Sequence, residues 1–330
     1  MAATQTTYRV QGIPANASFD DVKTIISKAF DKDGVKANPT IHSLASDPYS
    51  PVNNGTKVAT VTFAQTPGNL KNRGEVTAIV PWGYESHRIF VDSSFQGFTS
   101  LNDAEDDSGD TIDIIAVSGL SSHPFGSWKE RGGTFMWLRD EVAKTAKRAR
   151  VLLYGYDTTL VNSESFQDIG DIATRLSSDV NAIRGARSAQ EAFVPTPIVF
   201  IAHSLGGLVV KEYPDDFLSI YGLLFFGVPN GGIKTEYWMP IVDRMPNRGL
   251  ITSLEPDAYY LRNLQHTQTP FNQNHSGLPK FRSKYDANYK AIEPFFTECY
   301  NDAFEVIQKR FIAEGLSHHL HSHSMDEGLC

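Results

Sequence analysis

Ser204 stands among small residues at the end of a short apolar run, a setting that suits a catalytic nucleophile. Ile198–Ile201 is uninterrupted apolar sequence, which is typical of a strand covered on both faces of a parallel sheet. Ala202-His-Ser-Leu-Gly206 then fits the small-x-Ser-x-small pattern of a nucleophile elbow, with alanine as its first small residue. A sharp turn that lifts the serine brings its neighbours together, so those neighbours must lack bulk. The pattern predicts a strand, a strained turn and a helix start.

The backbone around this serine can stabilise an anion. Leu205–Val210 predicts a helix whose first N–H groups point toward the serine. Another strand is expected at Thr111–Val117, and the loop after it contains Gly119 and Leu120, where such a fold makes half of an oxyanion hole. We expect the N–H groups near these two residues and at Leu205 to hold the oxyanion. The competing interpretation is a structural turn, but the preceding strand and the following glycine pair favour the elbow.

His275 is the candidate base, because in this arrangement the histidine follows the serine along the chain. Its polar surroundings, Asn272–Gly277, suit a surface histidine equally well, so spacing alone leaves both interpretations open. His266 is a weaker candidate. So is a C-terminal group that resembles at most a weak metal-binding tract: His318, His319, His321 and His323. No metal site is predicted.

The catalytic acid cannot be assigned from the sequence. Asp243, Glu255 and Asp257 lie between the serine and the histidine. Nothing in their spacing separates them from ordinary surface carboxylates, so the acid stays unknown.

The composition excludes several classes of protein. The 330 residues, 41% of them hydrophobic, suffice for a large α/β domain and a small companion. A net charge of −8 disfavours nucleic acid as a partner. Cys299 and Cys330 are too few for a disulfide framework or a zinc site, which indicates a reducing, cytoplasmic setting. The N-terminus lacks a secretory pattern and no apolar run could span a bilayer, so membrane contact would be peripheral. No cofactor is needed.

The chain divides into a small α+β domain over residues 1–99, an acidic linker over 100–110 and a larger domain over 111–330. The small domain is predicted to run strand, helix, strand, strand, an order that resembles an RNA-recognition-motif or ferredoxin-like fold: Tyr8–Ile13, Ser18–Phe30, Thr40–Leu44 and Lys57–Phe63. Arg9, Val58 and Thr60 stand where base-stacking aromatics would be, so we expect no RNA binding. The partner of this domain stays unknown.

Strands and helices alternate in the larger domain, which predicts a mainly parallel sheet. Helices are expected from Trp137 to about Lys147 and over Ser165–Ile183, and strands over Arg150–Tyr156 and Ser219–Pro229. The second helix places one apolar face toward the core: Phe166, Ile169, Ile172, Ala173, Leu176, Val180 and Ile183.

Several motifs in order make the larger domain resemble the serine esterases of the α/β-hydrolase fold, in the group related to GPI-inositol deacylases. They are Val117-Ser-Gly-Leu120, His123-Pro-Phe-Gly-Ser-Trp-Lys129, Trp137-Leu-Arg-Asp140, Tyr154-Gly-Tyr-Asp-Thr158, Ser165-Phe-Gln-Asp-Ile169, Ile201–Leu208 and Gly222–Asn230. The lipase-like proteins with a serine active site found between the endoplasmic reticulum and mitochondria, and the hydrolase modules of fungal NACHT or NB-ARC receptors, look most similar. The family's nucleophile maps onto Ser204 and its histidine onto His275.

The resemblance implies a serine hydrolase that acts on carboxylic, especially lipid, esters, with peripheral contact at the endoplasmic reticulum or mitochondrion. The sequence departs from the family at Ser118, where histidine is usual, and at Ser121-Ser122, where glycines are common. The strand that ends in the family's acid is also missing, because Leu264–Pro270 is too short and polar to hold it. The alternative is therefore a weakened or inactive hydrolase-fold module for signalling or scaffolding, part of a larger receptor-like protein.

Overall fold

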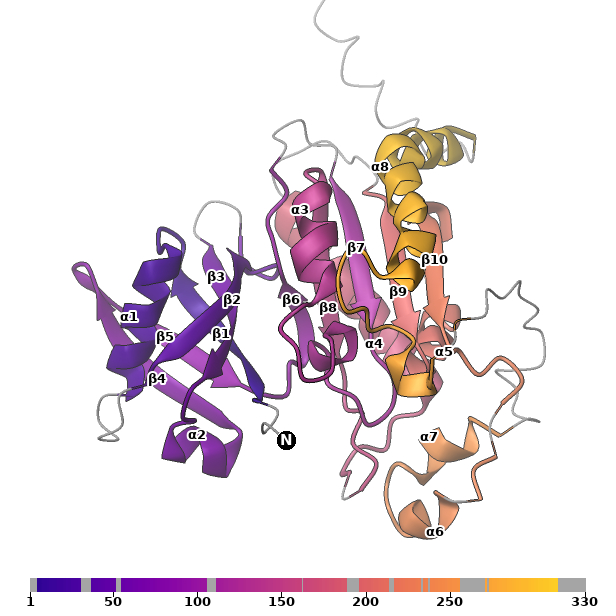
Figure 1. Ribbon diagram of the computed structural model, residues 1–330, viewed down its shortest axis with the longest axis horizontal. Helices are drawn as coiled ribbons and strands as arrows, with labels where there is room; N and C mark the ends of the chain where they lie inside the picture. Colours follow the sequence, from indigo (N-terminus) through magenta and orange to yellow (C-terminus); the bar gives the residue numbers. More distant parts are fainter. Residues whose placement is uncertain are drawn as a thin grey trace, which may run out of the picture.

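The computed structural model describes residues 5–30, 37–51, 55–105, 111–161, 163–188, 196–213, 217–232, 234–236, 238–255, 271 and 273–313. Within these ranges the chain forms two five-stranded sheets that stand side by side (Figure 1). The protein is therefore of mixed α/β class. No described helix is long and apolar enough to cross a bilayer.

The first sheet is antiparallel, with strand order β2-β3-β1-β5-β4. Its elements are β1 (Thr7–Pro14), α1 (Phe19–Phe30), β2 (Pro39–Ser46), β3 (Thr56–Phe63), α2 (Gly68–Arg73), β4 (Glu75–Trp82) and β5 (Glu85–Asp92). Helix α1 begins with reciprocal caps, since Ser18 N–H donates to the Asp21 carboxylate at 2.8 Å and Asp21 N–H donates to Ser18 Oγ at 3.3 Å. Helix α2 lies within Gln65–Glu75, although the proline, glycine and asparagine residues of this segment are typical of a surface loop.

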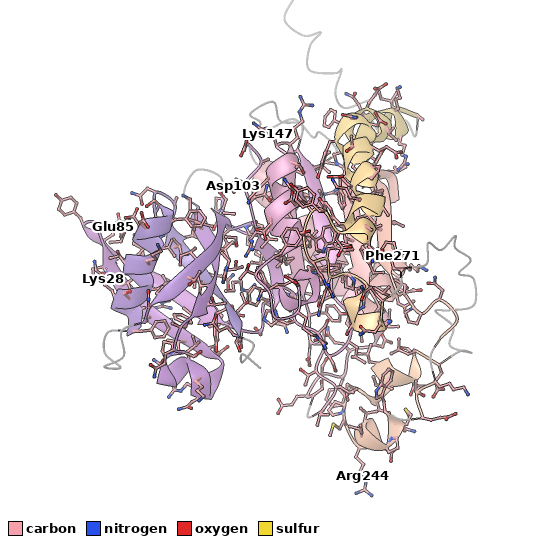
Figure 2. All side chains as sticks on the ribbon, viewed as in Figure 1. Lys28, Glu85, Asp103, Lys147, Arg244 and Phe271 are labelled. Carbon is pink, nitrogen blue, oxygen red and sulfur yellow. The ribbon has the colours of Figure 1, made fainter. Side chains whose placement is uncertain are left out.

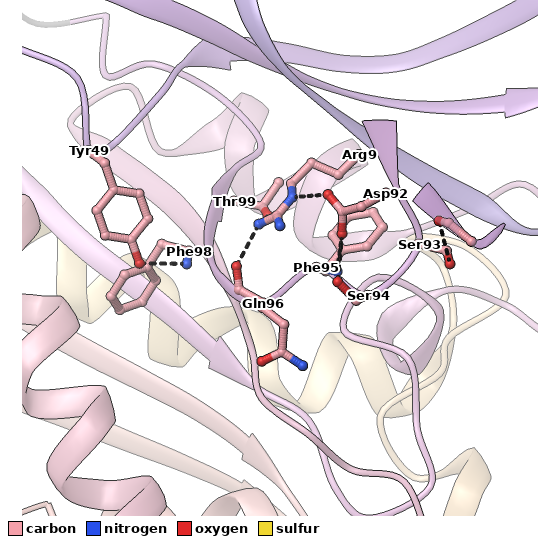
Figure 3. A network of polar contacts seen from close by, with 10 residues as sticks. Arg9, Tyr49, Asp92, Ser93, Ser94, Phe95, Gln96, Phe98 and Thr99 are labelled. Atoms are coloured by element: carbon pink, nitrogen blue, oxygen red, sulfur yellow. Dashed lines mark hydrogen bonds and ion pairs between the residues drawn. The ribbon is translucent and has the colours of Figure 1, made fainter. Parts of the chain in front are cut away.

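The N-terminal sheet also presents buried polar groups toward the second sheet (Figure 3). Arg9 Nε donates to the Asp92 carboxylate at 2.8 Å, and its Nη1 donates to the Gln96 carbonyl at 2.8 Å. Arg9, Val58 and Thr60 are all buried. The positions considered for base stacking are thus inaccessible in this arrangement, while the lack of RNA binding stays a prediction. Lys28 and Glu85 project on the opposite side, away from the second sheet (Figure 2).

The second sheet has the order β10-β9-β7-β8-β6. Its strands are β6 (Gly97–Ser100), β7 (Ile112–Val117), β8 (Ala149–Gly155), β9 (Ile198–His203) and β10 (Ile220–Phe226). The last four are parallel, and β6 is an antiparallel edge strand paired with β8. The second sheet therefore begins at Gly97, before the predicted domain boundary at residue 99. Glu105 N–H also donates to the Lys147 carbonyl at 2.7 Å. Residues 100–105 of the predicted linker therefore lie along the domain that contains the second sheet.

Helices cover both faces of this sheet (Figure 1). One core cluster joins the sheet to α4 (Ile169–Ser188) and α5 (Leu205–Lys211), with α6 (Met239–Val242) and α7 (Arg248–Thr252) beyond them. The opposite cluster joins it to α8 (Ala287–Ala313) and to the segment predicted as one helix from Trp137. That segment is a π-helix, Leu138–Val142, followed by α3 (Ala143–Thr145). Arg244 lies at the outer end of the α6–α7 region (Figure 2).

Candidate active site

Ser204 occupies the turn between β9 and α5, as the sequence pattern predicts. Its backbone has φ 54° and ψ −124°, a strained conformation for a residue with a side chain. Ser204 N–H donates to the carbonyl of Phe226, the last residue of β10, at 2.9 Å. The strained turn is therefore held from the neighbouring strand, and the hydroxyl is lifted above the end of the sheet.

The small residues after the serine are required by close packing. A Cβ atom on Gly206 would lie 2.4 Å from the Val117 carbonyl oxygen, and one on Gly207 would lie 2.1 Å from a methyl group of Val228. The Val117 carbonyl belongs to the backbone of a packed strand, so it has little freedom to move. The glycine pair thus lets α5 start directly against β7.

His275 meets the serine although 71 residues separate them: its Nε2 lies 2.9 Å from Ser204 Oγ. The histidine begins a short 3₁₀ turn, His275–Gly277, on an exposed loop. The ring still loses some hydration where it lies beside His203 and Gly227, and this desolvation lowers the pKa of His275 from its ordinary value. A neutral imidazole with Nε2 facing the hydroxyl can act as a general base.

His203 positions the loop that carries His275, a role that the sequence reasoning missed. Its ring Nε2 lies 3.0 Å from the His275 carbonyl oxygen, so Nε2 carries the proton in this contact. Burial lowers the pKa of His203 to about 4, which keeps the ring neutral near pH 7. The residue fills an unspecified position of the elbow pattern, so no motif indicated it.

The loop after β7 brings Gly119 against the serine. A Cβ atom on Gly119 would lie 2.7 Å from Ser204 Cβ and 3.0 Å from the His203 carbonyl oxygen. Tyr156 OH donates to the Ser118 carbonyl at 2.8 Å and anchors this loop. Leu120 follows in the same loop, partly buried against the core below the elbow.

The N–H groups of Gly119, Leu120 and Leu205 have no hydrogen-bond acceptor within the described part of the chain. Leu205 opens α5 and Gly119 abuts the serine, so free donors approach Ser204 from two segments. Free donors beside a nucleophile are what an oxyanion hole requires.

No carboxylate among the described residues hydrogen-bonds His275. Asp243 pairs with Arg248 at 3.6 Å, and Glu255 accepts a hydrogen bond from Thr235 Oγ1 at 2.8 Å. Asp257 and the rival His266 lie outside the described residues, as do the C-terminal histidines. The described residues contain no cluster of histidine, cysteine and carboxylate groups that could hold a metal ion.

Comparison with known proteins shows a distant similarity. No family model matches the chain. A segment is 24% identical over 181 residues to human Protein SERAC1, covering 46% of this chain and 27% of that protein. The chain thus matches about a quarter of the length of this relative, and the similarity supports a relation to it only at a distance.

Proposed function

We propose that this chain is a serine hydrolase of carboxylic esters, with Ser204 as nucleophile and His275 as general base. The observation that carries the proposal is the 2.9 Å contact between Ser204 Oγ and His275 Nε2 on a strained strand-to-helix turn. The chain order, serine before histidine, is that of an α/β-hydrolase. The motifs and the partial similarity to SERAC1 support assigning residues after Gly97 to that fold and to the serine esterase family.

Each side chain then has one step to perform. Ser204 Oγ attacks the carbonyl carbon while His275 Nε2 takes its proton. The N–H groups of Leu205 and of the Gly119–Leu120 loop hold the developing oxyanion. When the tetrahedral intermediate collapses, His275 returns the proton to the leaving alkoxide. Water then releases the acyl group by the same steps, and the reaction needs no cofactor.

From the resemblance to the serine esterases, we propose that the substrates are lipid esters and that the protein contacts membranes of the endoplasmic reticulum or mitochondrion peripherally. The first sheet resembles a ferredoxin-like fold, and we propose that fold for it. A negatively charged chain is a poor partner for nucleic acid, so the proposal includes no nucleic-acid ligand.

A second function is favoured by one observation, the absence of a carboxylate beside His275 among the described residues. The acid of a triad orients the imidazole and stabilises its protonated form. A hydrolase fold without it can serve as a signalling or scaffold module, the alternative that the sequence raised.

Labelling with a fluorophosphonate probe separates the two functions. The hydrolase should be labelled, and Ser204→Ala should abolish the label because the modified atom is gone. Ser178→Ala is the matched control, since Ser178 is an exposed serine on α4. Absence of labelling of the folded wild-type chain, or labelling that survives Ser204→Ala, would favour the scaffold function.

A further inference from the structure

A cavity of about 440 Å³ borders the loop that carries His275. Asn274, Ser276 and Gly277, which flank the histidine, form one wall of it. Arg131, Lys280 and Arg282 also line it, and none of these three cations forms an ion pair with another described residue. Cations without ion-pair partners, gathered in a cavity beside the loop that carries the candidate base, are suited to bind an anion.

The backbone of Lys280 is held in place, although its ammonium group forms no ion pair with a described residue. Its N–H donates to the Gly277 carbonyl at 3.0 Å, and the carbonyl of the preceding Pro279 accepts from Trp137 Nε1 at 2.9 Å. Phe281, on the other side, is buried. The ammonium group therefore extends from a fixed segment of backbone, so binding an anion there would order few additional groups.

The charges nearby agree with an anion site. Partial burial, together with the positive charge of Arg131, lowers the pKa of Lys280. Two carboxylates, Glu130 and Asp286, also line the cavity. Asp286 already accepts hydrogen bonds from the N–H groups of Arg282 at 3.2 Å and Asn288 at 3.0 Å. Three cations against two carboxylates leave a net positive wall, and an incoming anion would relieve the repulsion between Lys280 and Arg131.

We propose that this cavity binds an anionic group of the substrate, so that the preferred esters carry a carboxylate or phosphate close to the scissile bond. The proposal rests on the proposed hydrolase function and names its substrate class. The chemistry shared by the two groups, negatively charged oxygens that accept hydrogen bonds from Lys280 and Arg131, is what the cavity would recognise.

The test compares three p-nitrophenyl esters of similar acyl length: one neutral, one ending in a carboxylate and one ending in a phosphate. Wild type should show a higher kcat/KM for at least one anionic ester than for the neutral ester. Lys280→Gln should lower the ratio of anionic to neutral kcat/KM about tenfold, the size expected for one charge-assisted hydrogen bond. Lys280→Arg should keep most of the preference for the anionic ester. The larger of the two wild-type ratios, carboxylate to neutral or phosphate to neutral, identifies which anion is preferred.

Lys284→Gln is the matched control, because Lys284 lies on the same loop but places its ammonium over the Tyr285 ring, 5.4 Å from the centroid. It removes the same charge outside the cavity and should leave the ratio unchanged. An anionic preference that is absent in wild type, or a ratio equally affected by both lysine variants, would overturn the proposal.

A binding measurement that needs no catalysis distinguishes failure of this inference from failure of the proposed function. Inorganic phosphate should raise the Tm of Ser204→Ala in a saturable manner and raise the Tm of Ser204→Ala/Lys280→Gln much less. Phosphate binding without ester hydrolysis would contradict the hydrolase and retain the anion site. Hydrolysis that depends on Ser204, with equal phosphate effects in both variants, would retain the hydrolase and reject the anion site.

Discussion

His275 Nε2 lies 2.9 Å from Ser204 Oγ, while the Nδ1 of the same ring faces the backbone of Gly227 and has no carboxylate partner among the described residues. The nucleophile and base are thus in contact, but the described chain offers no acid to fix the tautomer. The backbone of His275 is held instead by His203 Nε2, at 3.0 Å from the His275 carbonyl.

Turnover should accordingly be slow but measurable. Loss of a triad acid costs about 10⁴ in kcat, so we expect short-chain ester hydrolysis orders of magnitude below the ~10 s⁻¹ that is common for enzymes. His275→Ala should slow it by a further factor of about 10² or more, because proton transfer is lost. Steady-state hydrolysis of p-nitrophenyl acetate tests this, with His87→Ala in the first sheet as control. A wild-type kcat near the common value, or no effect of His275→Ala, would refute the acid-free mechanism.

The pH profile should report the desolvated base. His275 acts when neutral, and desolvation lowers its pKa below the ordinary value of 6.5. The kcat/KM should therefore rise with pH through an apparent pKa below 6.5 and stay constant above neutrality. A carboxylate beside the ring would shift this pKa upward. An apparent pKa above the ordinary value would show that His275 has an acidic partner.

Gly119→Ala should damage catalysis by displacing the nucleophile. The added methyl group would lie 2.7 Å from Ser204 Cβ, closer than carbon atoms can approach. A shift of the serine by about 1 Å should lower kcat/KM by about 10²-fold. Gly231→Ala, whose Cβ would meet nothing within 4 Å, is the control. Thermal unfolding of both variants separates a displaced nucleophile from a protein that fails to fold, and equal activity of the two would contradict the packing argument.

Local patterns in the sequence predicted the strand-turn-helix around Ser204, because an apolar run and a glycine pair act over a few residues. The contact with His275 depends on tertiary structure, so chain order and resemblance supplied the candidate while spacing did not. The prediction that Phe166 faces the core is wrong: it is 82% exposed and precedes α4. The helix starts later because Asp168 and Asp171 cap each other's N–H groups, at 3.1 and 2.9 Å.

Elements without a strong local signal escaped prediction. Helix α8 packs over the sheet but has Pro294 in its interior, which argues against a helix when only the sequence is considered. The buried pair Arg9–Asp92 joins residues on different strands, and neither side chain belongs to a motif. The contact follows from the register of β1 against β5, which places Arg9 opposite Asp92 in the first sheet.

Removal of one partner of the buried Arg9–Asp92 pair should strongly destabilise the protein. Both side chains are almost fully buried, and Arg9 Nη1 also donates to the Gln96 carbonyl at 2.8 Å. Arg9→Met leaves the Asp92 charge buried without its cation, which should cost about 3 kcal/mol or more in the free energy of unfolding. Urea denaturation measures this, and Arg88→Met, an exposed arginine on β5, is the control. Similar midpoints for the two variants would show that the pair contributes little.

Acid should destabilise the contact between the two sheets through His42. Its Nε2 lies 2.9 Å from Thr62 Oγ1 in the first sheet. Its ring centroid lies 6.1 Å from that of Phe125, which packs in the core of the second sheet. Burial, with the nearby charges of Arg139 and Lys129, lowers the pKa of His42 from 6.5 to about 4, although Asp140 opposes this.

Because the unfolded chain protonates this histidine first, the folded state loses stability as pH falls from about 6.5 toward 4, and regains it as pH rises. A pKa shift of this size corresponds to at most about 3 kcal/mol of the free energy of unfolding. Because the ring keeps some exposure to water, we expect a smaller loss. The Tm of wild type should therefore fall more between pH 7.5 and 5 than that of His42→Asn, in which this titration is absent. His87→Asn is the matched control for the substitution itself, since His87 lies on β5 beside the exposed Glu85. If His42→Asn and wild type lose the same Tm on acidification, protonation of His42 does not drive the loss of stability.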